Sequence, residues 1–108
     1  MSELDLITPG EILLEEFMKP NDISQAQMAK DLNIPVSRIR GVVHGRSHIT
    51  ADLALRLARY FGTTAELWLS LQNEYDVRKT QRAIGKDIKR QVQPLVKHFT
   101  NNLSESHR

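Results

Sequence analysis

Residues 24–46 read SQAQMAKDLNIPVSRIRGVVHGR, and this stretch decides the fold. Ser24 is a residue type that caps helix N-termini, and apolar residues then recur at the spacing of one buried helix face. These residues are Ala26, Met28, Ala29 and Leu32. Asn33 tolerates the left-handed backbone conformation that ends many helices, and Pro35 suits the first turn of a new one. The pattern predicts two short helices joined by a tight turn.

The second of these helices is predicted to run from Pro35 to about His44. Its expected inner face consists of Val36, Ile39, Val42 and Val43. Ser37, Arg38 and Arg40 fall mainly outside that face. Two short helices with so small a turn, the second carrying cations outward, are typical of a helix-turn-helix motif, here over about residues 24–44.

Three more helices are expected around this motif, and no alternating strand pattern accompanies them. Thr8, Thr50 and Thr64 are predicted to cap them. Their expected apolar sides are Ile12, Leu13, Leu14, Phe17 and Met18 in the first, Leu53, Leu55, Leu57, Ala58 and Phe61 in the fourth, and Leu67, Trp68, Leu71 and Tyr75 in the fifth, which is expected to end near residue 76. The predicted fold class is therefore all-α, with five helices in residues 1–78.

Residues 79–108 form a basic tail in which a further amphipathic helix is expected. Its stripe consists of Ile84, Ile88, Val92, Leu95, Val96 and Phe99. Gly85 disfavours a continuous helix, and Pro94 either kinks it or starts a second one. The apolar side chains of this stripe are expected to be buried against their own domain, against a partner, or against a second copy of the chain. We expect Ile84, Ile88, Val92, Leu95 and Phe99 to form a dimer interface.

Charge is distributed unevenly along the chain. Residues 1–20 hold five acids and one lysine, whereas residues 35–60 hold five arginines and one acid, and the tail from residue 77 holds eight cations and two acids. Such asymmetry suggests that one face meets a polyanion while another stays acidic. The alternative is that these charges line solvated helix surfaces.

Length and composition exclude several classes of protein. The 108 residues suffice for one domain, and the chain has no cysteine for a disulfide, a thiolate metal site or a nucleophile. No histidine spacing fits a metal site, no glycine-rich loop fits a phosphate, and no catalytic grouping is present. No apolar run is long enough for a membrane span, and the start lacks the features of a signal peptide. We expect a cytoplasmic protein that is not an enzyme and that needs no metal, cofactor or small-molecule substrate.

The candidate DNA-binding residues follow from the geometry of a helix in the major groove, whose N-terminal part meets base edges. On this helix they are Val36, Ser37, Arg38, Arg40 and Gly41, preceded by Gln25 in the helix before and followed by Arg46 and Ser47, which are placed for phosphates. Two of these assignments have alternatives. Arg40 is the one most open to a salt bridge with an acid, and Gly41 either lets the helix approach bases or lets it pack. An ordinary helical hairpin is the alternative for the whole segment.

Residues 24–46 resemble the helix-turn-helix of the lambda- and 434-repressor-like (XRE) regulators. Residues 9–17, 45–58 and 61–76 are similar to the HigA/VapI antitoxin branch, with Ala65 in place of a frequent proline and His44 in place of a frequent asparagine. The basic tail is longer than the branch leads us to expect.

This resemblance implies a lambda-repressor-like domain and a type II antitoxin. Such proteins neutralise a small basic RelE-like toxin that cleaves mRNA, and they bind a palindromic operator as homodimers to repress their own operon. Attraction to a basic toxin makes the acidic first twenty residues a candidate docking surface. Two alternatives stay open: a stand-alone regulator without a toxin, and an interaction module that does not bind DNA.

Overall fold

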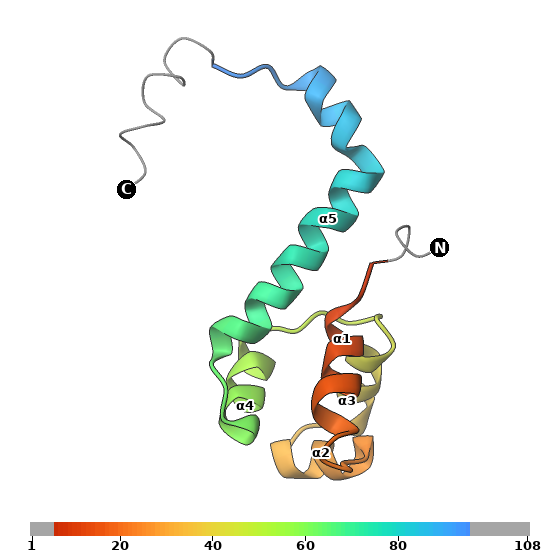
Figure 1. Ribbon diagram of the computed structural model, residues 1–108, viewed down its shortest axis with the longest axis vertical. Coiled ribbons are helices and arrows are strands. Elements are labelled where there is room, and N and C mark those ends of the chain that lie inside the picture. Colours follow the sequence, from red (N-terminus) through yellow and green to blue (C-terminus); the bar gives the residue numbers. More distant parts are fainter. Residues whose placement is uncertain (1–5, 96–108) are drawn as a thin grey trace.

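The computed structural model describes residues 6–95, and these form five consecutive helical segments without a strand (Figure 1). The first segment begins as α1 (Pro9–Ile12) and continues as η2 (Leu13–Met18), and the others are α2 (Gln25–Leu32), α3 (Val36–Val43), α4 (Ala51–Phe61) and α5 (Ala65–Gln91). The all-α prediction is confirmed. The pair α2–α3 is the expected helix-turn-helix, and α4 packs against both α2 and the start of α5.

Side chains cap every predicted helix start except that of α3, where Pro35 makes no side-chain cap bond. The hydroxyls of Thr8, Ser24, Thr50 and Thr64 accept hydrogen bonds from backbone N–H groups three residues further along, at 3.1, 3.0, 3.2 and 3.1 Å. Thr8 and Glu11 form a reciprocal capping box. Asn33 and Gly62 end α2 and α4 in the left-handed conformation, with φ of 61° and 73°. The four caps and the left-handed Asn33 agree with the predictions from the sequence.

The first helix departs from regular α geometry in one respect. From Leu13 to Met18 it widens into a π turn, in which the N–H of Lys19 bonds to the carbonyl of Leu14, five residues earlier, at 2.9 Å. No local pattern in the sequence predicted this widening. Glu15 and Glu16 lie in the widened segment, and both line the groove described below.

The core lies between the helix-turn-helix and the first half of α5. It is built from Leu13, Met18, Met28, Ala29, Leu32, Ile39, Val42, Val43, Ile49, Leu53, Ala54, Leu57 and Trp68. Three predicted core positions are wrong: Ala26 is exposed, Leu55 is 64% exposed, and Leu67 is 38% exposed. Each lies near residues that are buried as predicted, since spacing alone leaves the edges of a helix face uncertain.

Trp68 is fully buried, as expected for a single tryptophan on an apolar face. Its ring lies 4.7 Å from that of Phe17, centroid to centroid, which joins η2 to α5. Its indole N–H donates to the hydroxyl of Thr63 at 2.8 Å, so the one polar atom of the ring has a partner.

The fifth helix is much longer than predicted. It continues without a break through Gly85 to Gln91, so the expected end near residue 76 is wrong. Pro94 neither kinks the helix nor starts another helix among the described residues, because the helix ends at Gln91. Proline disfavours helical conformation in the residue before it, which is consistent with a helix end at this point. The boundary expected near residue 78 falls inside α5 and stays a prediction.

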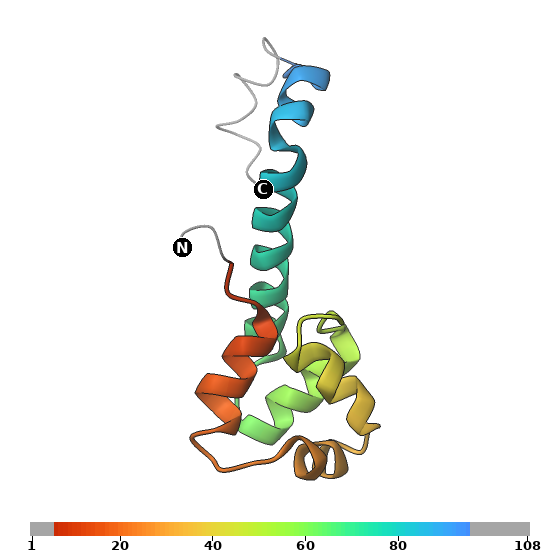
Figure 2. The same cartoon turned by 90° about the vertical axis from the view of Figure 1, so that its right-hand side faces the viewer.

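Figures 1 and 2 show, from two directions, the second half of α5 extending away from all the other helices. At about 1.5 Å per residue, the 27 residues of α5 span about 40 Å. Ile84 and Ile88 are each 44% exposed, and Val92 and Leu95 are 63% and 69% exposed. Val96 and Phe99 lie outside the described residues. The four described members of the stripe are not part of the core, so for them the expected burial against their own domain is wrong.

Candidate nucleic-acid interface

Helix α3 has one side in the core and one side open. Ile39, Val42 and Val43 are buried, and Val36 is half-buried against the core. Ser37 and Arg40 are exposed on the outer side. The helix begins at Val36 with Pro35 as its cap residue. Its N-terminal part, from which a recognition helix presents side chains to base edges, is thus accessible.

Arg38 on this helix is bonded to the start of α4. Its Nη1 donates to Oδ2 of Asp52 at 3.1 Å, and its Nη2 donates to the hydroxyl of Thr50 at 3.0 Å. From the sequence, Arg40 was the arginine expected to be most open to a salt bridge. The structure instead pairs Arg38 with an acid, and the guanidinium of Arg40 makes no ion pair within residues 6–95.

Asp52 receives a second guanidinium from its own helix. The Nε of Arg56 donates to both carboxylate oxygens, at 3.2 and 3.1 Å, and its Nη1 donates to the carbonyl of Leu32 at 2.8 Å. Hydrogen bonds from Arg56 first, and then from Arg38, hold the pKa of Asp52 below its ordinary value of 3.8. The Asp52 carboxylate therefore joins α3 to α4, and Arg56 extends this network to the end of α2.

The turn after α3 folds back on the helix. Gly45 adopts a φ of 76°, and the N–H groups of Arg46 and Ser47 both donate to the carbonyl of Gly41, at 2.8 and 3.1 Å. A Cβ at Gly41 would lie 2.5 Å from the Ser47 hydroxyl oxygen. This glycine thus makes room for the turn, which is the packing alternative of the sequence analysis. Its contact with DNA stays a prediction.

The side chains of Arg46 and Ser47 are exposed, and Gln25, in the first turn of α2, is half-exposed. Gln25 precedes α3 along the chain and Arg46 and Ser47 follow it, and their contacts with DNA stay a prediction. The interface residues are therefore accessible except for Gly41, which is buried.

Sequence reasoning missed two residues that organise this surface, Asp52 and Gln72, and it predicted Thr50 as a helix cap without its bond to Arg38. Gln72 is a buried amide on α5 whose Oε1 accepts from the N–H of Ile49 at 2.8 Å and whose Nε2 donates to Asp76 at 3.0 Å. It fixes the loop that follows α3. A signal existed for Asp52, because it is the one acid among the five arginines of residues 35–60. No local signal marked Gln72.

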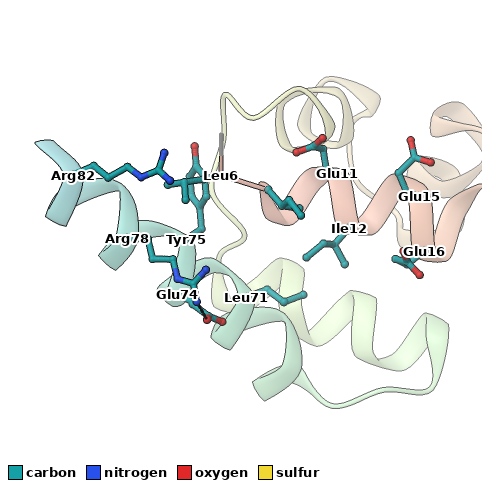
Figure 3. A pocket seen from close by; sticks show the side chains of 11 residues that line it. Leu6, Glu11, Ile12, Glu15, Glu16, Leu71, Glu74, Tyr75, Arg78 and Arg82 are labelled. Atoms are coloured by element: carbon teal, nitrogen blue, oxygen red, sulfur yellow. Dashed lines mark hydrogen bonds and ion pairs between the residues drawn. The ribbon is translucent and has the colours of Figure 1, made fainter. Parts of the chain in front are cut away.

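A second surface lies where α1 and η2 face α5. It is a groove of about 590 Å³ with an apolar floor that includes Ile12, Leu71 and Tyr75. Four glutamates line it, namely Glu11, Glu15, Glu16 and Glu74, together with two arginines, Arg78 and Arg82. Figure 3 shows Glu11, Glu15 and Glu16 on the first helix, and Glu74, Arg78 and Arg82 on α5. The acids of the first helix that the sequence analysis singled out are thus brought together with apolar surface.

Two further findings bear on function. None of the helices in the described part of the chain has the length and apolar character needed to cross a membrane. Residues 6–95 contain no group of three or more histidines or acids placed to hold a metal ion.

Comparison with known proteins agrees with this geometry. A helix-turn-helix family model matches residues 14–68. Virulence-associated protein I of Dichelobacter nodosus is 46% identical over 81 residues, which cover 75% of each chain. The solved structure of the Pseudomonas aeruginosa antitoxin HigA with the higBA promoter superposes with a TM-score of 0.81 at 41% identity, covering 83% of this chain and 98% of that one.

The chain belongs to the helix-turn-helix family, in its HigA/VapI branch. A further relative is YbaQ of Escherichia coli K12, an uncharacterised HTH-type transcriptional regulator that is 32% identical over 73% of this chain and 75% of its own. Proteins of this family are DNA-binding regulators and not enzymes. The HigA-type neighbours support the same general function, DNA-binding regulation of the antitoxin kind, for this chain.

Proposed function

We propose that the chain is the antitoxin of a type II toxin-antitoxin system, which captures a small basic RelE-like toxin and represses its own operon in the cytoplasm. One observation carries the DNA half: the N-terminal part of α3 presents Ser37 and Arg40 outward while Ile39 and Val42 hold the helix in the core. The similarity to an antitoxin solved with its promoter supports the same reading.

Operator recognition in this proposal divides between two groups of residues. Val36, Ser37, Arg38 and Arg40 meet base edges, where arginine pairs with guanine acceptors and an apolar group meets the thymine methyl. Gly41 is buried and supports this surface by making room for the turn after α3. Arg46 and Ser47 contact phosphates beside the groove, which fixes the register of the helix without reading sequence, and Gln25 contacts either a phosphate or a base.

A palindromic operator requires two copies of α3 about one helical turn of DNA apart. We propose that the stripe Ile84, Ile88, Val92, Leu95 and Phe99 brings the two copies together. Support comes from its first four members, which lie exposed on or just after a helix that projects beyond the domain. An apolar stripe of this length is costly to leave in water, and a second copy supplies an identical stripe.

The acid-lined groove between the first helix and α5 is our proposed docking site for the toxin. Glu15 and Glu16 give it negative charge, and its apolar floor gives a dehydrated contact area. A toxin that binds RNA carries a basic surface, so the charges are complementary. Glu15 is paired with Lys19 at 2.8 Å, and a toxin cation would compete for the same carboxylate.

The test of the proposed function is affinity capture of the tagged chain from its native host, with protein and DNA recovered together. We expect a small basic protein encoded beside this gene, together with the DNA upstream of that operon. Recovery of the DNA without such a protein would favour the second candidate, a stand-alone regulator, which similarity to the E. coli regulator also supports. Recovery of neither would contradict both.

Substitutions then separate the surfaces. Arg46→Ala should weaken binding to all duplexes alike and lower the salt slope by about one, since one phosphate contact is lost. Arg78→Ala, which removes a cation paired with Glu74 on α5, is the control and should leave the slope unchanged. An unchanged slope in Arg46→Ala would remove this residue from the phosphate contacts.

The two protein interfaces are tested with opposite readouts. Ile88→Glu should give monomers in light scattering at unchanged domain stability, whereas Glu15→Lys with Glu16→Lys should abolish toxin capture and leave dimers intact. If the charge reversal breaks the dimer instead, the groove receives the second copy and the toxin assignment is wrong.

A further inference from the structure

We propose that Asp52 is a positioning residue for operator reading, which together with Thr50 holds the Arg38 guanidinium in the orientation from which it meets a base. The inference rests on the proposed DNA-binding function and goes beyond it, because it assigns a role to an acid on a surface that must bind a polyanion.

The geometry defines one orientation of Arg38. Its two terminal nitrogens are held separately, Nη1 by Asp52 at 3.1 Å and Nη2 by Thr50 at 3.0 Å. Both acceptors are fixed in turn: the Thr50 hydroxyl caps α4 by accepting from Leu53, and Asp52 accepts from Arg56. A guanidinium held at two points cannot rotate about its last bonds without breaking one of them.

The bonds leave Arg38 able to bind. A guanidinium has five N–H donors, and these two contacts use two of them. The remaining donors exceed the two that a bidentate contact with guanine needs. The side chain is 35% exposed, so it is not sealed from a ligand.

Stability does not explain the arrangement. Asp52 has an exposed fraction of 53%, and an ion pair so open to water contributes little to folding. An acid on a DNA-facing surface also repels phosphates. This repulsion is offset if holding Arg38 in one orientation before binding lowers the entropy lost when the side chain is ordered on a base.

The test compares Asp52→Asn with Glu66→Gln in the full chain. Asp52 and Glu66 both occupy the second position of a helix, after Thr50 and Thr64 respectively, so both variants lose one negative charge at the same place relative to a helix start. Each protein selects its sites from a random-duplex library, and binding to the selected site is measured against single-base changes.

We expect Asp52→Asn to lose about fivefold to tenfold of its discrimination at one base position, which is part of the value of a bidentate contact. Its affinity for unrelated duplexes should stay equal or rise, because a repelling charge is gone. Glu66→Gln should keep the wild-type profile. Unchanged or sharper discrimination in Asp52→Asn would overturn the proposal, the latter by showing that Asp52 competes with DNA for Arg38.

The variant Arg38→Ala with Asp52→Asn shows whether the effect passes through Arg38. The added Asp52→Asn change should have no further effect on base preference once Arg38 is absent. A further loss in this background would mean that Asp52 acts through the fold, and the proposal would fail.

A readout without DNA separates failure of this inference from failure of the proposed function. In ¹⁵N NMR the Arg38 guanidinium should rotate slowly in the wild type and in Glu66→Gln, and faster in Asp52→Asn. Slow rotation in a chain that selects no duplex would refute the DNA-binding function and with it the inference. Fast rotation in a wild-type chain that does select duplexes would refute the inference alone.

Discussion

The two halves of α5 carry similar apolar spacing and have opposite surroundings. In the first half Trp68 and Gln72 are buried and joined by hydrogen bonds to the loops on either side of α4. In the second half Ile84 and Ile88 stay 44% exposed, and the Arg90–Asp87 ion pair joins neighbours on the same helix. Periodicity thus predicts that a helix forms, but it does not predict what packs against the apolar face of that helix.

The largest expected effect is at Gly10 in the packed domain, and it contrasts with the effect expected at Gly85 in the projecting half of α5. A Cβ at Gly10 would lie 1.8 Å from the carbonyl oxygen of Val42, because the start of α1 packs directly on the backbone of α3. Backbone cannot yield as a side chain can, so Gly10→Ala should destabilise the domain by about 3 kcal/mol or more. Urea unfolding followed by circular dichroism measures this. Wild-type stability would show that α1 does not approach α3 so closely.

Gln72 tests the cross-helix bonds of the packed half. Removing its amide leaves the buried N–H of Ile49 without an acceptor, so Gln72→Ala should cost about 1–3 kcal/mol. Its exposed neighbour Asn73 supplies the control, and Asn73→Ala should change stability by less than about 0.5 kcal/mol. Equal effects of the two variants in thermal unfolding would contradict the anchoring role.

Gly85 offers the matched substitution in the projecting half. The nearest atom to an added Cβ is Cβ of Gln81 at 3.8 Å, which is ordinary contact distance. Gly85→Ala should therefore stabilise the helix by about 0.5–1 kcal/mol through the lower backbone entropy of alanine. Helicity and melting temperature report the gain. A loss of stability with a loss of dimer would instead indicate that a second chain packs closely at this glycine.

The smallest expected effect is on the pKa of one carboxyl group, that of Asp31 on α2. The Tyr60 hydroxyl on α4 donates to Asp31 on α2, and this bond, followed by one from Gln27, lowers the pKa of Asp31 below 3.8. Its contribution to stability is complete above pH 3.8 and is lost as the pH falls through the lower folded-state value. Tyr60→Phe should raise the pKa of Asp31 toward the ordinary value.

An NMR titration of the aspartate carboxyl carbons measures that shift. Asp52 is the internal control, because its pKa is lowered by Arg56 and Arg38 and should not respond to Tyr60. An unshifted Asp31 would show that the hydroxyl is not its partner.

Signals that act over three or four residues were predictable from the sequence. Thr8, Ser24 and Thr50 cap helices as expected, Asn33 takes the left-handed conformation, and the outer position of Ser37 is correct. The exposed side of the candidate interface was therefore predictable. Leu55 was not, because its place at the edge of an apolar face depends on which helix lies opposite.

The sequence by itself thus determined the five helices, the helix-turn-helix and its family, since capping and spacing depend on near neighbours. Tertiary structure alone decided that Arg38 and not Arg40 is held by an acid, that Gln72 supports the loop after α3, and that Glu15 and Glu16 share a groove with α5. These contacts join residues 14 or more positions apart, and whether they meet depends on how the helices cross.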